Sequence, residues 1–360
     1  MSPPRVTGEA ADEVRQLVPT VEQLGLRLSD VNYLADEGLA AGVFLSLRLP
    51  LPLLLEGEAG VGKTQLAKAL AAVLNTPLIR LQCYEGIDAA EALYEWNYPR
   101  QLLSIRLSDS TGSKLGEHEL FGPDYLIRRP LLRALEHPGP RPAVLLIDEI
   151  DRADDDFEAF LLELLAEATV TIPEIGTIQA THPPIVVLTS NRTRDLHDAI
   201  KRRCLYQWID YPDVRRESDI LMRMVGGSAR LIVEVATAIA RMRAADVIKP
   251  PGVAESIDWL AALKLLGIKR LDPAAIDRTL GSVLKYPEDQ EAVRAAGLEN
   301  LIGTGDAGTS GVRAGSADAG AASQGHHDTG GAPEGRQSGA PEGQHDTAGA
   351  PEGRQSGEAG

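Results

Sequence analysis

The residues best suited to chemistry form the glycine-rich stretch 57–64, GEAGVGKT, which matches the phosphate-loop pattern G-x-x-x-x-G-K-[ST]. Its glycines let backbone N–H groups turn toward a polyphosphate, and the start of the following helix adds positive potential. Lys63 would reach the β- and γ-phosphates, and the Thr64 hydroxyl would bind Mg²⁺. We therefore expect ATP and Mg²⁺ as cofactors, held by Gly57, Glu58, Ala59, Gly60, Val61, Gly62, Lys63, Thr64 and Gln65. A ligand-free glycine-rich turn is the alternative.

Two carboxylates, Asp148 and Glu149, follow the apolar run Ala143–Ile147. An apolar strand that ends in Asp-Glu brings both groups to the edge of a sheet beside the phosphate loop. There Asp148 would hold Mg²⁺ through water, and Glu149 would polarise the attacking water. Acidic residues also end strands without any catalytic role, which is the alternative for this pair.

A third polar group, Asn191, follows the apolar run Ile185–Ser190. At the tip of a strand between the other two motifs, its side chain would orient water or the γ-phosphate. An asparagine that caps a turn is the alternative.

Five apolar runs predict the strands that position these groups, with a helix over Gln65–Leu74 directly after the phosphate loop. The strands are expected at Leu51–Glu56, Leu78–Gln82, Ala143–Asp148, Ile185–Ser190 and Tyr206–Asp210. Two short runs, 169–173 and 176–180, predict a β-hairpin. The strand–loop–helix order predicts an α/β fold.

Other helices are predicted from apolar spacing at Asp30–Leu45, Ala89–Ile105 and Asp156–Ala168. In the first of them Tyr33, Leu34 and Asp36 would lie near an adenine ring, and simple packing is the alternative. From Pro212 onward the spacing of apolar residues predicts mainly helices.

The chain divides into four predicted segments: a flexible N-terminus at 1–18, an α/β nucleotide-binding domain at 19–211, a small helical domain at 212–300, and a tail at 301–360. The tail is rich in glycine, alanine and proline and repeats the unit Gly-Ala-Pro-Glu-Gly. Such a segment buries too little apolar surface to offset its ordering entropy, so we expect it to be disordered.

The 360 residues carry a net charge of −16 and only two cysteines. An acidic chain is a poor candidate for direct, non-specific nucleic-acid binding. Cys83 and Cys204 fit neither a metal site nor a disulfide framework, which indicates a reducing compartment, the cytoplasm. The apolar stretch Leu39–Leu55 contains Arg48 and two prolines, so we expect no membrane span.

Taken together, these motifs resemble the AAA+ ATPases, and among them the MoxR group. Over residues 20–300 the chain is most similar to CoxD-like members linked to carbon monoxide dehydrogenase maturation. The phrases more specific to that group are YEWNY at 94–98, LIRRPLL at 126–132 and IDEIDRA at 147–153. The resemblance implies a five-stranded parallel sheet followed by a helical lid.

The resemblance also assigns roles to residues of this chain. Asn191 corresponds to the family's sensor 1, and Arg203, with Arg202 beside it, to the arginine finger that acts on a neighbouring subunit's ATP. Regions 84–130 and 169–180 correspond to inserts that face substrates. The lid helix that begins near Pro251 lacks the sensor 2 arginine of many relatives.

The function expected from this resemblance is Mg²⁺-dependent ATP hydrolysis by a MoxR-type chaperone that remodels a client protein. The client would be a molybdenum hydroxylase whose metal site needs completion. A hexameric ring and a von Willebrand A-domain partner are expected as well. The alternatives are a DNA-linked AAA+ motor subunit, which the acidic charge disfavours, and a P-loop phosphotransferase.

Overall fold

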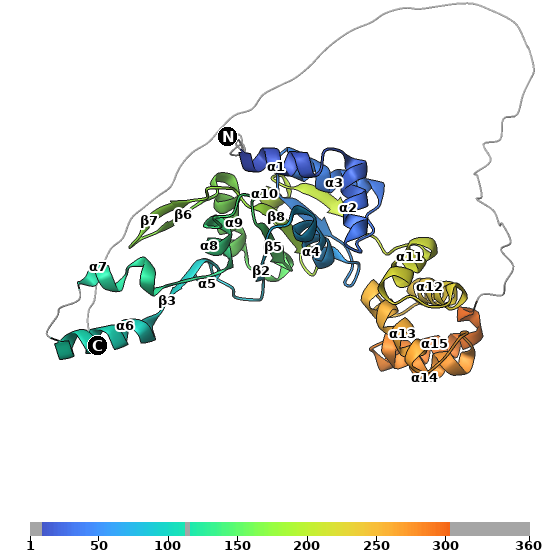
Figure 1. The fold of residues 1–360 in the computed structure, drawn as a ribbon. Helices are drawn as coiled ribbons and strands as arrows, with labels where there is room; N and C mark the ends of the chain where they lie inside the picture. The colour runs from blue at the N-terminus through green and yellow to red at the C-terminus, as the bar shows by residue number, and fades with distance from the viewer. Residues whose placement is uncertain (1–8, 112–115, 303–360) are drawn as a thin grey trace, which may run out of the picture. The chain divides into compact units, whose positions relative to one another are not determined.

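Five parallel strands form the central sheet, in the order β2–β5–β8–β1–β9 (Figure 1). The computed structural model describes residues 9–111 and 116–302. The strands are β1 (Leu53–Glu56), β2 (Leu78–Gln82), β5 (Val144–Asp148), β8 (Ile185–Ser190) and β9 (Leu205–Trp208). The predicted α/β class and five-stranded parallel sheet are confirmed, with differences only at strand ends. Because all five strands run the same way, their carboxyl ends meet at one edge.

Successive apolar side chains of these strands point to opposite faces of the sheet, so both faces are buried. In β5, Leu145 and Ile147 pack on one face with α8 (Pro130–Leu135) and α9 (Asp155–Glu167). On the other face Val144 and Leu146 pack with α4 (Lys63–Leu74), the helix after the phosphate loop. Figure 1 shows α4 on one side of β5 and β8, with α8 and α9 on the other. The residues at the strand tips are therefore fixed by a core on each side.

The N-terminal region differs from its prediction in two places. Helix α1 (Glu9–Leu17) replaces part of the predicted flexible segment, because Val14 and Val18 are buried in the core. Residues 1–8 lie outside the described ranges. Helix α2 (Val21–Asp30) is followed by a turn with Asn32 at φ +64°. Helix α3 (Glu37–Arg48) therefore begins later than the predicted Asp30. Its N-cap is Asp36, whose carboxylate accepts from Leu39 N at 2.7 Å.

The helix predicted over Ala89–Ile105 is wrong, because tertiary packing interrupts it. The structure has α5 (Ala89–Leu93), β3 (Tyr94–Trp96) and α6 (Tyr98–Thr111). Strand β3 pairs antiparallel with β4 (Leu126–Arg128), and the Trp96 ring stands edge-on to Phe121 at 5.3 Å. Aromatic residues favour such a pairing. The segment between the two strands also holds α7 (Glu117–Leu120).

The predicted hairpin is confirmed as β6 (Thr169–Ile172) paired with β7 (Gly176–Gln179). Two short helical segments flank the sheet edge, a 3₁₀ turn at Ile150–Arg152 and α10 (Asp198–Lys201).

Helices follow β9 in the part of the chain that the structure describes, up to residue 302, as predicted. They are α11 (Val214–Met224), α12 (Ala229–Ala244), α13 (Val253–Leu265), α14 (Pro273–Val283) and α15 (Pro287–Ala296). Their core surrounds the fully buried Trp259, whose indole N–H donates to Thr279 Oγ1 at 2.7 Å. Residues 303–360, where the disordered tail was expected, lie outside the described residues. Within the described residues, no helix has the length and apolarity needed to cross a membrane.

Candidate nucleotide site

The phosphate loop connects β1 to α4 at the carboxyl edge of the sheet. Gly62 immediately precedes α4 with φ +98°, a left-handed conformation that favours glycine. No side chain caps the helix there, and its first turn contains no acidic residue. The first N–H groups of α4 thus face the loop without a competing carboxylate, which suits an anion.

Lys63 is buried within this loop, at 7% exposure. Its ammonium donates to the carbonyl oxygens of Gly57 and Glu58, each at 2.7 Å. Burial lowers the pKa of Lys63, and the nearby carboxylates, Asp151 foremost, oppose that effect. A phosphate beside Lys63 would stabilise the charged ammonium in the same way.

Asp148 links the phosphate loop to the tip of β5. The Thr64 hydroxyl donates to Asp148 Oδ1 at 2.9 Å, and the Thr189 hydroxyl donates to the same oxygen at 2.6 Å. Arg80, from the neighbouring strand β2, donates through Nε to Oδ2 at 2.9 Å. Asp148 itself is almost fully buried. The two residues expected to hold Mg²⁺, Thr64 and Asp148, are therefore in direct contact.

Glu149 follows with an unusual backbone conformation, φ +57°. Its N–H donates to Thr189 Oγ1 at 2.9 Å, which fixes the residue at the strand tip. Its carboxylate is paired with the Arg152 guanidinium at 3.4 Å. A non-glycine residue in this region is strained, and such strain is often found at functional sites.

Asn191 is held in place through its backbone by Asp151. Asp151 Oδ2 accepts from Asn191 N at 3.1 Å, from Thr193 N at 2.8 Å and from Thr193 Oγ1 at 2.7 Å. Asp151 is buried, at 2% exposure. The loop after β8 is thus tied to the segment that carries Glu149.

These groups surround one cavity of about 410 Å³, within the range of small-molecule sites. Its polar lining includes Lys63, Thr64, Asp148, Glu149 and Asn191. The rest comes from the phosphate loop and α4, the segment before α3, the tip of β8, the segment after β9, α11 and α13. Among these are Ala59, Gly60, Val61, Gly62, Gln65, Tyr33, Leu34, Arg216, Met224, Val253 and Ile257. Gly57 and Glu58 do not line it, and their carbonyls bind Lys63 instead.

The segment before α3 contributes only part of what was expected near an adenine. Tyr33 and Leu34 line the cavity. Asp36 does not; its carboxylate caps α3 and pairs with Arg216 of α11 at 2.6 Å. Arg216 also donates to Leu34 O at 2.7 Å. One side of the cavity is therefore closed by contacts between α11 and this segment.

The start of α13 touches the phosphate loop through main chain alone. Val253 N donates to Gly60 O at 2.9 Å. A Cβ added at Gly252 would lie 2.8 Å from Gly60 Cα, so only glycine fits this approach. Glu255 Oε2 accepts from Gly252 N at 3.0 Å and completes the helix cap. A glycine contact therefore joins the phosphate loop to the helix in which the family resemblance led us to look for a sensor 2 arginine.

Arg202 and Arg203 lie apart from this cavity. Arg202 ends α10, and the Arg203 guanidinium donates to the carbonyl of Leu162 in α9. Both side chains are exposed, and neither lines the cavity. The structure therefore brings the phosphate loop, Asp148, Glu149 and Asn191 together and leaves this arginine pair on another surface.

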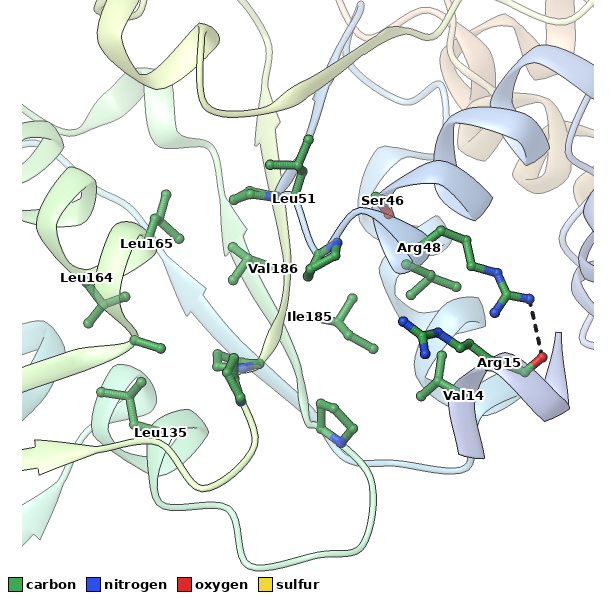
Figure 2. Close-up of a pocket in the computed structure, with 17 residues that line it drawn as sticks. Val14, Arg15, Ser46, Arg48, Leu51, Leu135, Leu164, Leu165, Ile185 and Val186 are labelled. Carbon is green, nitrogen blue, oxygen red and sulfur yellow. Dashed lines mark hydrogen bonds between the residues drawn. The ribbon is translucent and has the colours of Figure 1, made fainter. Parts of the chain in front are cut away.

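A second cavity, of about 80 Å³, lies at the opposite edge of the sheet (Figure 2). Figure 2 shows Leu51 before β1 and Ile185 at the start of β8, with Leu135 and Leu164 nearby. Its lining is mainly leucine, valine and proline. Its described lining residues include no carboxylate.

Sequence reasoning missed three residues that organise the site: Arg80, Asp151 and Thr189. Each acts through a partner distant in the chain, so no local spacing reveals it. Only the polar tip of an apolar strand, Thr189-Ser190, gave a signal.

Comparisons with known proteins agree with this architecture. Residues 52–204 match the family described as "AAA domain (dynein-related subfamily)". The fold and the matched segment define a P-loop AAA domain.

Among curated proteins, the chain is similar to the denitrification regulatory protein NirQ of Pseudomonas aeruginosa, with 24% identity over 70% of this chain and 88% of that protein. It is also similar to protein CbbQ of Hydrogenophilus thermoluteolus, with 25% identity over 52% of this chain and 64% of that protein. Among solved structures, a RuvB mutant of Thermotoga maritima aligns with a TM-score of 0.41 and 17% identity, covering 76% of this chain and 72% of that one.

Proposed function

We propose that this protein is a MoxR-type AAA+ ATPase that hydrolyses ATP with Mg²⁺. The observation that carries the proposal is the direct contact between Thr64 of the phosphate loop and Asp148 of β5, beside Lys63 and Glu149 in one cavity. A phosphotransferase would not need this combination together with an exposed arginine pair.

In this proposal the phosphate loop and Lys63 bind the β- and γ-phosphates. Glu149 orients the attacking water and accepts its proton, and Asn191 fixes the water or the γ-phosphate. Arg203, with Arg202, completes the site of a neighbouring subunit. Tyr33 and Leu34 contact the base.

The donor set of the site fits Mg²⁺, since a hydroxyl and a carboxylate are the oxygen ligands that this ion prefers. Thr64 and Asp148 would hold it. When bound, Mg²⁺ would supply positive charge that neutralises the phosphates.

The finer parts of the proposal come from resemblance. We propose a hexameric ring in the cytoplasm that acts as a chaperone, with a von Willebrand A-domain partner. The client would be a molybdenum hydroxylase, as for CoxD-like members. Similarity to a denitrification regulatory protein supports a regulatory role, and the client itself rests on family analogy. The Glu149→Gln variant should bind ATP without hydrolysing it. A protein that co-purifies with this variant would be identified as the client.

Two variants test the ATPase. Lys63→Ala should weaken ATP binding, because it removes the charge that faces the phosphates. Glu149→Gln should keep ATP binding and lose turnover, because only water activation changes. Fluorescent-nucleotide titration and phosphate release measure the two effects separately. Wild-type turnover in Glu149→Gln would show that the role assigned to this residue is wrong.

A further inference from the structure

Asp148 already has a hydrogen-bond partner at each site that a carboxylate offers. Oδ1 accepts from the Thr64 and Thr189 hydroxyls at 2.9 and 2.6 Å. Oδ2 accepts from Arg80 Nε at 2.9 Å and lies 2.6 Å from Arg80 Nη2. A carboxylate has two oxygens with about four lone-pair positions. A metal-bound water can therefore approach Asp148 only if one of these donors leaves.

Arg80 is the donor best able to leave. Thr189 is buried at 1% exposure and also accepts from Glu149 N, so its hydroxyl is fixed at both ends. Thr64 begins α4 and belongs to the same proposed metal site. The Arg80 side chain is 49% exposed, against 3% for Asp148, and it extends from the edge strand β2. Water can hydrate the guanidinium as it withdraws, which lowers the cost of breaking the pair.

We propose that Arg80 competes with Mg²⁺ for Asp148 and so sets the metal concentration at which the site loads. This inference rests on the proposed function. The Arg80 guanidinium contacts Oδ2 through both Nε and Nη2, so it places a positive charge beside the carboxylate and repels an incoming cation. Arg80 does not line the cavity, so it acts on the nucleotide through Asp148 and is a positioning residue.

The test measures metal-dependent nucleotide binding without turnover. Fluorescent ADP is titrated onto the full chain at increasing free Mg²⁺, for the wild type, Arg80→Gln and Arg80→Lys. Arg80→Gln removes the charge and should lower the half-saturating Mg²⁺ concentration about fivefold, the upper range for a partly exposed ion pair. Arg80→Lys keeps the charge and should stay nearer the wild type. Binding in EDTA should be unchanged.

Arg294→Gln is the matched control. Arg294 is 43% exposed and pairs with Asp277 at 2.7 Å, in helices α14 and α15 away from the cavity. It should not move the Mg²⁺ midpoint. If Arg80→Gln does not fold, as judged by thermal melting, Arg80→Met replaces it, because methionine also removes the charge and keeps an apolar stem.

A higher or unchanged Mg²⁺ midpoint in the charge-removing variant, with nucleotide binding intact, would overturn the competition. A higher midpoint would mean that Arg80 orients Asp148 for the metal. If the wild type binds no nucleotide at saturating Mg²⁺, the proposed function itself fails. An unchanged or higher Mg²⁺ midpoint in the variant would overturn only the competition and would leave the proposed function intact.

Discussion

A single hydroxyl contacts the Asp148 carboxylate and the Glu149 main chain. Thr189 Oγ1 donates to Asp148 Oδ1 at 2.6 Å and accepts from Glu149 N at 2.9 Å. Thr189 is buried, at 1% exposure. The geometry of the two acidic residues therefore depends on a neighbouring strand, β8, as much as on their own.

Replacing Thr189 by valine, which has nearly the same shape, should damage turnover more than binding. It leaves the Glu149 N–H without a partner and removes one of the two hydrogen bonds to Asp148 Oδ1, since Thr64 still donates to that oxygen. An unpaired buried N–H costs about 1–3 kcal/mol in stability. We expect turnover to fall about tenfold or more. If the loss of this hydrogen bond raises the activation free energy by about 1.4 kcal/mol, the rate falls tenfold. Phosphate release and thermal melting measure the two effects.

Thr189→Ser is the control, because it restores the hydroxyl and should recover most of the activity. Equal turnover in the valine and serine variants would contradict a positioning role for the hydroxyl.

The nucleotide-site motifs could be read from the sequence because each is local. Lys63 and Thr64 follow a glycine loop, and Asp148 and Glu149 follow an apolar run. The partner Arg80 could not be found in this way. Its contact with Asp148 depends on the pairing of β2 with β5, where Gln82 lies opposite Asp148, and no single-chain pattern contains that register.

The start of α13 packs closely against the phosphate loop, where its main chain contacts that of Gly60. Gly252→Ala should lower nucleotide affinity, because the added Cβ would stand 2.8 Å from Gly60 Cα and 3.1 Å from Ala59 O. Backbone atoms cannot rotate away as a side chain would, so the phosphate loop or α13 must shift. Nucleotide titration measures the loss, for which we expect about tenfold, the effect of roughly 1–3 kcal/mol of overpacking.

Gly25→Ala in α2 is the matched control. An added Cβ there meets nothing within 4 Å. Alanine in a helix interior is favoured over glycine by about 1 kcal/mol, so this variant should melt higher with unchanged affinity. Unchanged affinity in Gly252→Ala as well would show that the loop tolerates displacement at this contact.

Elements were predicted well where the apolar period was strong and one core decided the outcome, as in β5, β8 and α9. The helix predicted over Ala89–Ile105 failed because Tyr94–Trp96 join β4, a partner that lies beyond α6. Helix α1 was missed because its short apolar face becomes visible only against the buried core that covers Val14 and Val18. The domain boundaries at 211 and 300 stay predictions.

In the proposed oligomer, the exposed arginine pair would act on the nucleotide of a neighbouring subunit. Arg202 and Arg203 do not line their own subunit's cavity. A guanidinium supplied from another subunit can stabilise charge on the γ-phosphate, an effect worth about 10³–10⁵ in rate in GTPases. Arg203→Ala should therefore bind ATP and hydrolyse it slowly. The alternative is a structural arginine that clamps an acidic residue between subunits.

Mixing subunits separates these alternatives. Lys63→Ala and Arg203→Ala proteins, each nearly inactive alone, should regain turnover when combined, because a mixed interface unites an intact Lys63 with an intact Arg203. Light scattering must show that both assemble. Co-assembly without any return of activity, at every ratio, would exclude the shared site.

The left-handed backbone of Glu149 has a consequence for how this chain can be altered. Glycine and asparagine adopt φ +57° with less strain than glutamate, yet neither supplies a carboxylate. A laboratory selection that rewards heat resistance alone would therefore favour residues at 149 that lack the carboxylate of the proposed function. Under the proposed function, a screen for more stable variants needs a turnover measurement in every round, since melting temperature and turnover would favour different residues at 149.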